Sequence, residues 1–337
     1  MPPTKTAETR EKPTLKTIAQ LSGLAVPTVS RALNDAPDIG QKTKEKVRRI
    51  ASEIGYVPNR AGVRLRTGRT NVISLVMSTH HDVMNHTSRL ISSVASGLRD
   101  TGFHLIVTPF FPEEDALKPV RYIVETGSAD AVILNQIEPE DPRVAYLRER
   151  RFPFATHGRT VWCDQHAYYD YDNQAFARIA GAKMAAIGRK RLVVIAPPRS
   201  HNYAKHMIAG FREAAEVAGT ELRVLDNVTS DSTSAEVKAT VARLLQDDPG
   251  IDAIACASTS SAMAAVAGLE AVGRKLGVDI DLCAKEAIPF LTLFRPDIIA
   301  VSEKVDAAGE FLARAAIQAI RDPSAAPLQQ LEVPTDT

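Results

Sequence analysis

The feature that most constrains the fold is a regular alternation of apolar runs and amphipathic stretches from residue 72 onward. The apolar runs are 72–77, 103–110, 130–135, 153–158, 191–198, 221–228, 252–258, 281–286 and 298–304. Amphipathic stretches of helical period lie between them, for example 87–99, 174–187, 204–218, 234–246 and 259–276. Continuous apolar strands that alternate with helices predict parallel sheets covered on both faces. The runs form two sets, which predicts two doubly wound lobes with a cleft at the carboxyl ends of their strands.

The chain before residue 58 has a different pattern, of short helices. Thr14 is a suitable N-cap for a first helix, and Gly23 stands where that helix should end. Pro27 suits the first turn of a second helix. A third amphipathic stretch runs from about 41 to 54. Two short helices joined by a turn that contains glycine, with a third to support them, predict a helix-turn-helix unit.

Positive charge is concentrated in the same part of the chain. The first 70 residues contain 14 Lys and Arg against 6 Asp and Glu, whereas the remainder contains 27 against 34. A basic head on an acidic body indicates a polyanionic partner for the head alone.

Composition and motifs exclude several other classes. No apolar run reaches about 18 residues, so no membrane helix is expected. The polar first 16 residues lack the apolar core of a secretory signal, and we expect a cytoplasmic protein. Three widely spaced cysteines fit neither a disulfide framework nor a zinc site, and neither His80–His81 nor His201 with His206 has a carboxylate or cysteine cluster beside it. The motifs of phosphate-binding loops, serine hydrolases and metalloproteases are missing, so we expect no enzyme, metal or cofactor.

Residues 14–76 closely resemble the head of the lactose-repressor (LacI/GalR) family. The most specific pieces are TVSRALN (28–34), KTKEKV (42–47) and GYVPNRAGVRLRTGRTNVI (55–73). The resemblance implies an all-α helix-turn-helix head with a hinge helix, followed by a periplasmic-binding-protein-like α/β core of two doubly wound parallel-sheet lobes. The domains expected on this basis are a disordered arm at 1–13, the head at 14–58, the hinge helix and linker at 59–70, and an effector-binding and dimerisation core at 71–337. Within the core we expect an N-lobe of 71–170 plus 298–325 and a C-lobe of 171–297 plus 326–337.

The second helix of the head is the expected reading helix. The resemblance places Val26 and Pro27 at the family's main base-reading positions and Arg31 at its arginine contact. Arg31 is the only side chain on this face that can bind guanine through two hydrogen bonds. The other expected DNA contacts are Thr14, Leu15, Lys16, Thr28, Ser30, Asn34, Tyr56, Asn59, Arg60 and Leu65, with Leu65 at the hinge position that wedges into the minor groove. Two residues depart from the family, Ala25 at the N-cap and Gly62 in the hinge helix.

The resemblance also implies an effector site between the lobes. The residues nominated for it are Ser78, His80, Asp82, His157, Arg159, Tyr203, His206, Ser258 and Glu286. Arg159 and Glu286 are expected to carry most of the polar recognition, because a guanidinium and a carboxylate together suit a polyol. Each of these residues has an alternative reading as an ordinary polar group at the end of a strand. Met207, Ser258–Thr259 and Glu286 differ from many family members, so the pocket is rebuilt here.

The function expected from these features is sequence-specific repression of transcription by a homodimer bound to double-stranded operator DNA. A small effector, with a sugar or glycoside as the first candidate, would set the affinity for the operator. Three alternatives stay open: a purine-type corepressor, a solute-binding receptor with the same core fold, and an enzyme with an accessory DNA-binding head.

The charge asymmetry predicts that DNA binding belongs to residues 14–70 and depends steeply on salt. If a dimer neutralises roughly 6–10 phosphates, the logarithm of the association constant should fall against that of salt with a slope of about −5 to −9. Fluorescence anisotropy over a salt series measures this slope. A salt-insensitive complex, or undiminished binding after deletion of residues 1–70, would contradict the prediction.

Overall fold

The computed structural model describes residues 12–57, 62, 64, 68–79 and 84–334. These residues belong to two compact units, the head within 1–70 and the core within 71–337. Most of the arm expected at 1–13 lies outside the described residues. Among the described helices, none is both long and apolar enough to cross a membrane.

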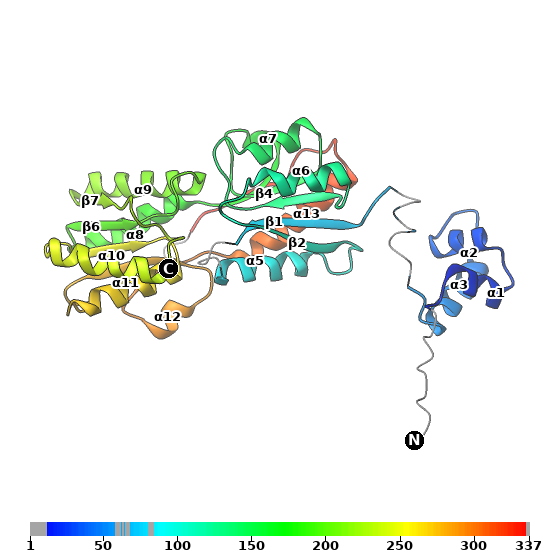
Figure 1. Ribbon diagram of the computed structural model, residues 1–337, viewed down its shortest axis with the longest axis horizontal. Coiled ribbons are helices and arrows are strands. Elements are labelled where there is room, and N and C mark those ends of the chain that lie inside the picture. Colours follow the sequence, from blue (N-terminus) through cyan, green and yellow to red (C-terminus); the bar gives the residue numbers. More distant parts are fainter. Residues whose placement is uncertain (1–11, 58–61, 63, 65–67, 80–83, 335–337) are drawn as a thin grey trace, which may run out of the picture. The chain divides into compact units, whose positions relative to one another are not determined.

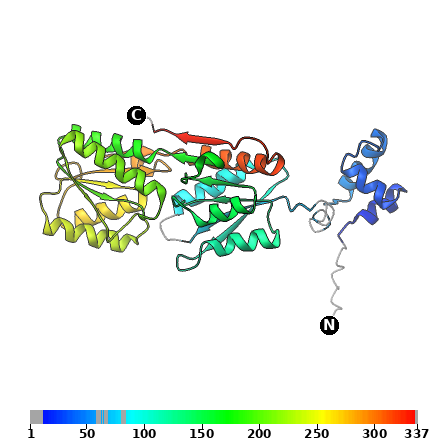
Figure 2. The same cartoon turned by 90° about the horizontal axis from the view of Figure 1, so that it is seen from above.

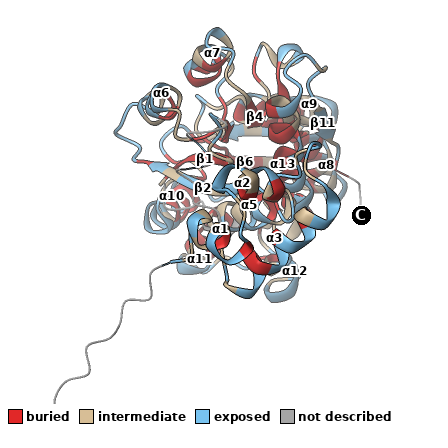
Figure 3. Cartoon of the chain, turned by 90° about the vertical axis from the view of Figure 1, so that its right-hand side faces the viewer, coloured by how far each residue is buried: buried red, intermediate tan, exposed pale blue. Residues whose placement is uncertain are grey.

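The head contains the three helices predicted from the sequence, α1 (Leu15–Ser22), α2 (Val26–Leu33) and α3 (Gln41–Glu53) (Figure 1). The Thr14 side chain caps α1, and Gly23 ends it in the left-handed region at φ 70°. α2 has Pro27 in its first turn and no side-chain cap at Ala25. The buried sides of the helices, seen in Figure 3, form one small core. Its buried members are Ile18, Val29, Ala32, Val47, Ile50 and Ala51.

The first lobe of the core is a six-stranded parallel sheet in the order β11-β5-β4-β3-β1-β2. Its strands are β1 (Val72–Ser78), β2 (His104–Phe110), β3 (Ala131–Leu134), β4 (Phe154–His157), β5 (Ala167–Tyr171) and β11 (Gln329–Glu332). Helices cover both faces of the sheet (Figure 2), and β1 is therefore buried along its whole length. These helices are α5 (Met84–Gly97), α13 (Val305–Arg321), α6 (Leu117–Thr126) and α7 (Pro142–Glu149), and the short helix η2 (Cys163–Gln165) lies between β4 and β5.

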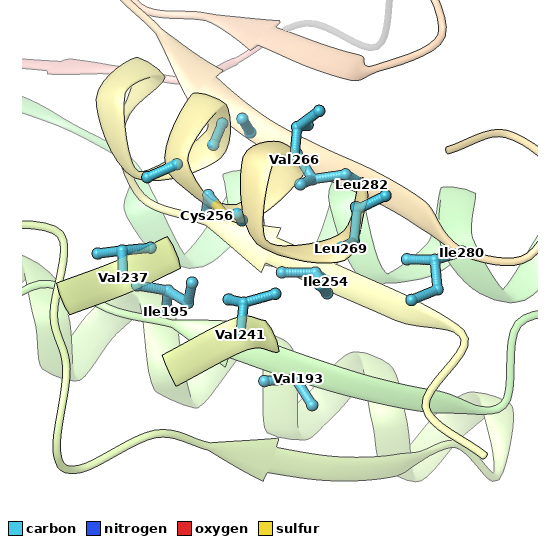
Figure 4. Packing of buried hydrophobic residues seen from close by; sticks show 14 of the residues in the cluster. Val193, Ile195, Val237, Val241, Ile254, Cys256, Val266, Leu269, Ile280 and Leu282 are labelled. Carbon is cyan, nitrogen blue, oxygen red and sulfur yellow. The ribbon is translucent and has the colours of Figure 1, made fainter. Parts of the chain in front are cut away.

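The second lobe is a five-stranded parallel sheet in the order β10-β9-β8-β6-β7. Its strands are β6 (Arg191–Ile195), β7 (Glu221–Val224), β8 (Ala253–Cys256), β9 (Asp281–Glu286) and β10 (Ile299–Ser302). α8 (Asn173–Ala186) and α9 (Asn202–Ala218) pack on one face, where Gly210 lets the two helices approach closely. α10 (Ser234–Asp247) and α11 (Thr259–Ala271) pack on the other face (Figure 4), and α12 (Phe290–Phe294) follows β9.

Two of the expected lobe boundaries are wrong. Residues 298–303 were assigned to the N-lobe, but β10 pairs with β9 and extends the C-lobe sheet. Residues 326–337 were assigned to the C-lobe, but β11 pairs with β5 and extends the N-lobe sheet. Both are short edge strands, and an edge strand joins whichever sheet offers unpaired backbone groups. Sequence alone does not show which sheet does so.

The chain crosses between the lobes twice among the described residues. The first crossing joins β5 to α8 at Asp172, and the second joins β10 to α13 through Glu303 and Lys304. Parallel strands in both lobes direct their carboxyl ends toward these crossings. Side chains that follow the strands in either lobe can therefore meet in a shared space.

Candidate functional site

The exposed face of α2 presents the predicted base-reading residues. Val26, Pro27 and Arg31 are exposed, whereas Thr28 and Ser30 are half-buried. Val29 points inward and belongs to the core of the head. Among the predicted backbone-contacting residues, Thr14 also caps α1, and the Asn34 amide donates to the Ser30 carbonyl at 2.6 Å. The structure thus gives these two residues a local role in holding the helices.

Several of the cationic side chains of the head form ion pairs within it. Arg31 pairs with Asp38, which lies in the turn after α2. Lys44 and Arg48 both bind the Asp35 carboxylate, at 3.0 and 2.9 Å. The hydrogen bond and charge of Lys44 lower the pKa of Asp35, so this carboxylate stays ionised. The cations of α3 therefore stabilise the turn between α2 and α3.

Little of the predicted hinge helix belongs to the described part of the chain. Gly62 and Arg64 are helical, and the Gly68 amide donates to the Arg64 carbonyl at 2.8 Å. Asn59, Arg60 and Leu65 lie outside the described residues.

A cavity of about 770 Å³, which includes its mouth toward solvent, lies between the two lobes of the core. The N-lobe contributes Asn135 and Gln136 after β3 and His157 at the end of β4. From the C-lobe come Tyr203 at the start of α9, Asp231 after β7 and Ser258 after β8. The lining therefore combines amides, a carboxylate, a hydroxyl and an aromatic ring, which is the usual composition of a small-molecule site.

Two of these side chains are held in arrangements that suit a ligand. Asn135 is buried, and its Oδ1 atom has no hydrogen-bond partner among the described residues. Gln136 has φ of 52°, in the left-handed region, and its amide lies 3.5 Å from Asp231 across the cleft. A buried acceptor without a donor costs about 1–3 kcal/mol, and a ligand hydroxyl relieves that cost.

The structure brings together only part of the predicted effector set. His157, Tyr203 and Ser258 line the cavity. His80 and Asp82 lie outside the described residues. The residues that the structure leaves out of the cavity lining are Ser78, Arg159, His206 and Glu286.

Arg159 and Glu286, the two expected to dominate recognition, have partners inside the protein. The Arg159 guanidinium donates to Asp170 at 2.6 Å. Glu286 is buried and accepts from the Leu291 amide at 2.9 Å and the Thr292 hydroxyl at 2.5 Å. It thus satisfies groups at the start of α12, so its carboxylate positions that helix. Arg159 therefore does not line the cavity itself, but it holds Asp170, which does.

A buried ionic cluster forms one wall of the cavity. Lys285 of β9 donates to Glu303 at 2.8 Å and to the Asn173 side chain at 3.2 Å. His86 of α5 and His157 stack with ring centroids 5.2 Å apart. Burial disfavours the Glu303 carboxylate, but the charges of Lys285 and His86 outweigh it and hold the pKa of Glu303 well below its usual range. Burial, reinforced by His86, lowers the pKa of His157 to about 3, so its ring is neutral at pH 7.

Several residues of the cavity are not among those predicted from the sequence. Asn135 ends the apolar run 130–135, and Glu303 lies near the end of 298–304. Each follows a strand, which is the same signal that nominated His157 and Ser258. His86 and Asp231 had no comparable signal, because one lies on a helix and the other in a loop.

Comparisons with known proteins agree with this architecture. Residues 14–59 match the family model described as bacterial regulatory proteins, lacI family. Residues 81–321 match the model described as periplasmic binding proteins and sugar binding domain of LacI family. The transcriptional regulator AglR of Rhizobium meliloti is 29% identical over 325 residues, covering 94% of this chain and 90% of AglR. CelR of Thermobifida fusca is 28% identical over 327 residues and 96% of each chain.

Solved structures are similar along almost the whole chain. A complex of the regulator CelR with cellobiose superimposes with a TM-score of 0.70 at 26% identity, covering 96% of this chain and 98% of that one. The Lac repressor dimer bound to operator and the anti-inducer ONPF has a TM-score of 0.81 at 18% identity, covering 96% and 97%. The latter identity is low, so this likeness concerns the fold alone. With a helix-turn-helix head, a two-lobed core and matches to both family models, the chain belongs to the lacI family of bacterial regulatory proteins and is a DNA-binding transcriptional regulator.

Proposed function

We propose that the protein is a repressor whose affinity for operator DNA is set by a neutral sugar, of disaccharide or glycoside size, bound between the lobes of the core. The observation that carries the proposal is the cavity of about 770 Å³ to which both lobes contribute polar side chains. A ligand held by both lobes favours one arrangement of the lobes over another by its differential affinity. It is thereby able to control the DNA-binding form of the protein.

The chemistry of the cavity supports a polyol. Asn135 offers a buried acceptor, Asp231 a carboxylate able to accept from two hydroxyls, and Tyr203 an aromatic face. Lys285, a cation of the lining, is already paired with Glu303. Asp231 adds negative charge to the cavity lining, which disfavours phosphorylated or carboxylated ligands. The solved CelR relative is a complex with cellobiose, which supports a disaccharide.

Lobe closure is held by contacts that a ligand is placed to change. The Asn202 backbone amide at the start of α9 donates to the Ile137 carbonyl at 2.8 Å, and its side-chain amide donates to the Arg159 carbonyl at 2.7 Å. Both acceptors belong to the N-lobe and both donors to the C-lobe. An effector that pushes the lobes apart breaks these bonds, whereas one that draws them together preserves them.

We also propose that the working unit is a homodimer on a pseudo-palindromic operator. One helix-turn-helix contacts only a few base pairs, and a two-fold symmetric dimer doubles the number of base pairs that are recognised. The core has exposed apolar side chains suited to self-association, with Leu293 74% and Phe294 67% exposed on α12 and Ile106 47% exposed on the edge strand β2. Large apolar side chains grouped on a surface mark interaction sites.

Effector binding is predicted to depend on Asp231. A thermal-shift screen with cellobiose, maltose and raffinose should give a stabilising sugar, because a ligand of the folded state raises stability by mass action. The Asp231→Asn variant should bind that sugar about 10- to 100-fold more weakly by calorimetry, as expected for hydrogen bonds to a charged group. Asp226→Asn is the matched control, since Asp226 is exposed and pairs with Arg199 outside the cavity. Stabilisation by guanine or hypoxanthine in place of sugars would support the purine-type alternative.

DNA binding is predicted to tighten when Arg31 loses its partner Asp38. The Asp38→Asn variant should bind an operator selected from random duplexes about 1.5- to 5-fold more tightly, matching the ~0.2–1 kcal/mol of an exposed ion pair. Glu53→Gln, at the exposed Arg49 pair of α3, removes the same charge from the head and serves as control. Anisotropy at fixed salt compares the two. Equal gains would assign the effect to net charge and not to Arg31.

Self-association is predicted to require α12. The double variant Leu293→Ser/Phe294→Ser should sediment as a monomer and lose most operator binding, because each half-site alone is bound weakly. Val217→Ser is the control, since Val217 is 91% exposed on α9. A dimer that persists in the double variant would place the interface elsewhere on the core.

A further inference from the structure

Three metal-binding side chains converge on the inner wall of the cavity. They are His86 of α5, His157 of β4 and Glu303 of the crossing from β10 to α13. The three are separated by 71 and 146 positions in the chain, so no sequence motif joins them. Their candidate ligand atoms all lie within 4.8 Å of one another.

The distances fit a small transition-metal ion. His86 Nε2 lies 3.4 Å from Glu303 Oε1, and His157 Nε2 lies 3.9 Å from the same oxygen. Zinc bound at about 2.0–2.1 Å in tetrahedral geometry separates its ligand atoms by about 3.3 Å. Side-chain movements of less than about 1 Å therefore bring the three atoms into a coordination shell. Two histidines and one carboxylate form the ligand set of zinc sites that keep one position open.

We propose that His86, His157 and Glu303 bind a divalent transition-metal ion of the zinc class, with its open coordination position toward the cavity. All three residues line that cavity, and His86 and Glu303 also border a smaller adjoining one beside Ser258. The ion is thus reachable from solvent and has space for a water molecule or a ligand hydroxyl.

A neighbouring residue orients the Glu303 carboxylate for metal binding. Lys285 donates to Glu303 Oε2, which leaves Oε1 for the two imidazoles and fixes the orientation of the carboxylate. Such second contacts to a metal-binding carboxylate hold it in place.

The nearby cation sets a limit on affinity. The Lys285 ammonium, which also donates to the Asn173 side chain at 3.2 Å, repels a divalent ion. The predicted site is therefore a reversible one, weaker than a structural zinc site with four protein ligands.

Calorimetry with zinc chloride on the full-length protein, without sugar, tests the inference. We expect one zinc ion per chain, and at least a tenfold loss of affinity in His86→Gln and, separately, in His157→Gln. His206→Gln is the control, because His206 is a half-buried histidine outside the cluster. Cobalt provides a second readout, since tetrahedral Co²⁺ with nitrogen ligands gives a visible absorption band that each cluster variant should lose. Thermal melting in EDTA checks that the variants fold, and His86→Asn or His157→Asn replaces any that does not.

The outcomes separate this inference from the proposed function. One zinc ion lost in both histidine variants and kept in the control supports the site. No saturable binding, or binding that survives both substitutions, overturns it. Sugar binding measured in EDTA tests the effector proposal independently, so either idea can fail while the other stands.

Discussion

The buried ion pair between Lys285 and Glu303 is the interaction on which the arrangement of the core depends. Lys285 lies next to the last residue of strand β9 in one lobe, and Glu303 lies on the segment that carries the chain into the other. Each charge would be costly to bury alone, and removing one partner of such a pair typically costs about 3–5 kcal/mol. The pair therefore ties the crossing segment to the C-lobe sheet. It also sets the charge of the cavity wall, because Glu303 faces His86 and His157 on its other side.

Charged side chains also stabilise the fold of the head. Its small core contains six buried apolar side chains, so the turn between α2 and α3 depends on polar contacts. Asp35 has φ of 58° and is held by Lys44 and Arg48, while Lys46 donates to the Ser22 carbonyl at 2.8 Å. Several of the cations that make the head basic thus stabilise the fold before any DNA is bound. The net charge of the head draws in a polyanion, but contacts with bases depend on the few side chains exposed on α2.

Sequence periodicity predicted the parts of the fold where burial is complete. β1, β3 and β8 are buried throughout, and the apolar runs that predicted them are unbroken. It failed for β5 and β11, because β5 contains Asp170 and β11 is an exposed edge strand.

The residues of the site were harder to predict than the strands, because their roles depend on contacts between distant parts of the chain. Glu286 and His157 were both predicted as site residues because each lies at the end of a strand. Only the tertiary structure shows that the Glu286 carboxylate accepts hydrogen bonds from α12. His86 and Glu303 meet through folding alone, which no local pattern records.

The arrangement of contacts around the cavity explains how a small ligand is able to act on the whole core. The Asn202 hydrogen bonds to backbone carbonyls join the two lobes, and the Lys285–Glu303 pair anchors the crossing segment to the C-lobe sheet. Asn135 lines the same cavity, and its buried oxygen has no donor among the described residues. A ligand whose hydroxyl binds Asn135 while the Asn202 hydrogen bonds remain intact stabilises the arrangement seen here. A ligand that binds Asn135 only after those hydrogen bonds break stabilises a more open form. The arrangement of the lobes that a ligand favours therefore follows from the size of the ligand relative to the cleft, and the magnitude of its effect is bounded by the difference in affinity between the two forms.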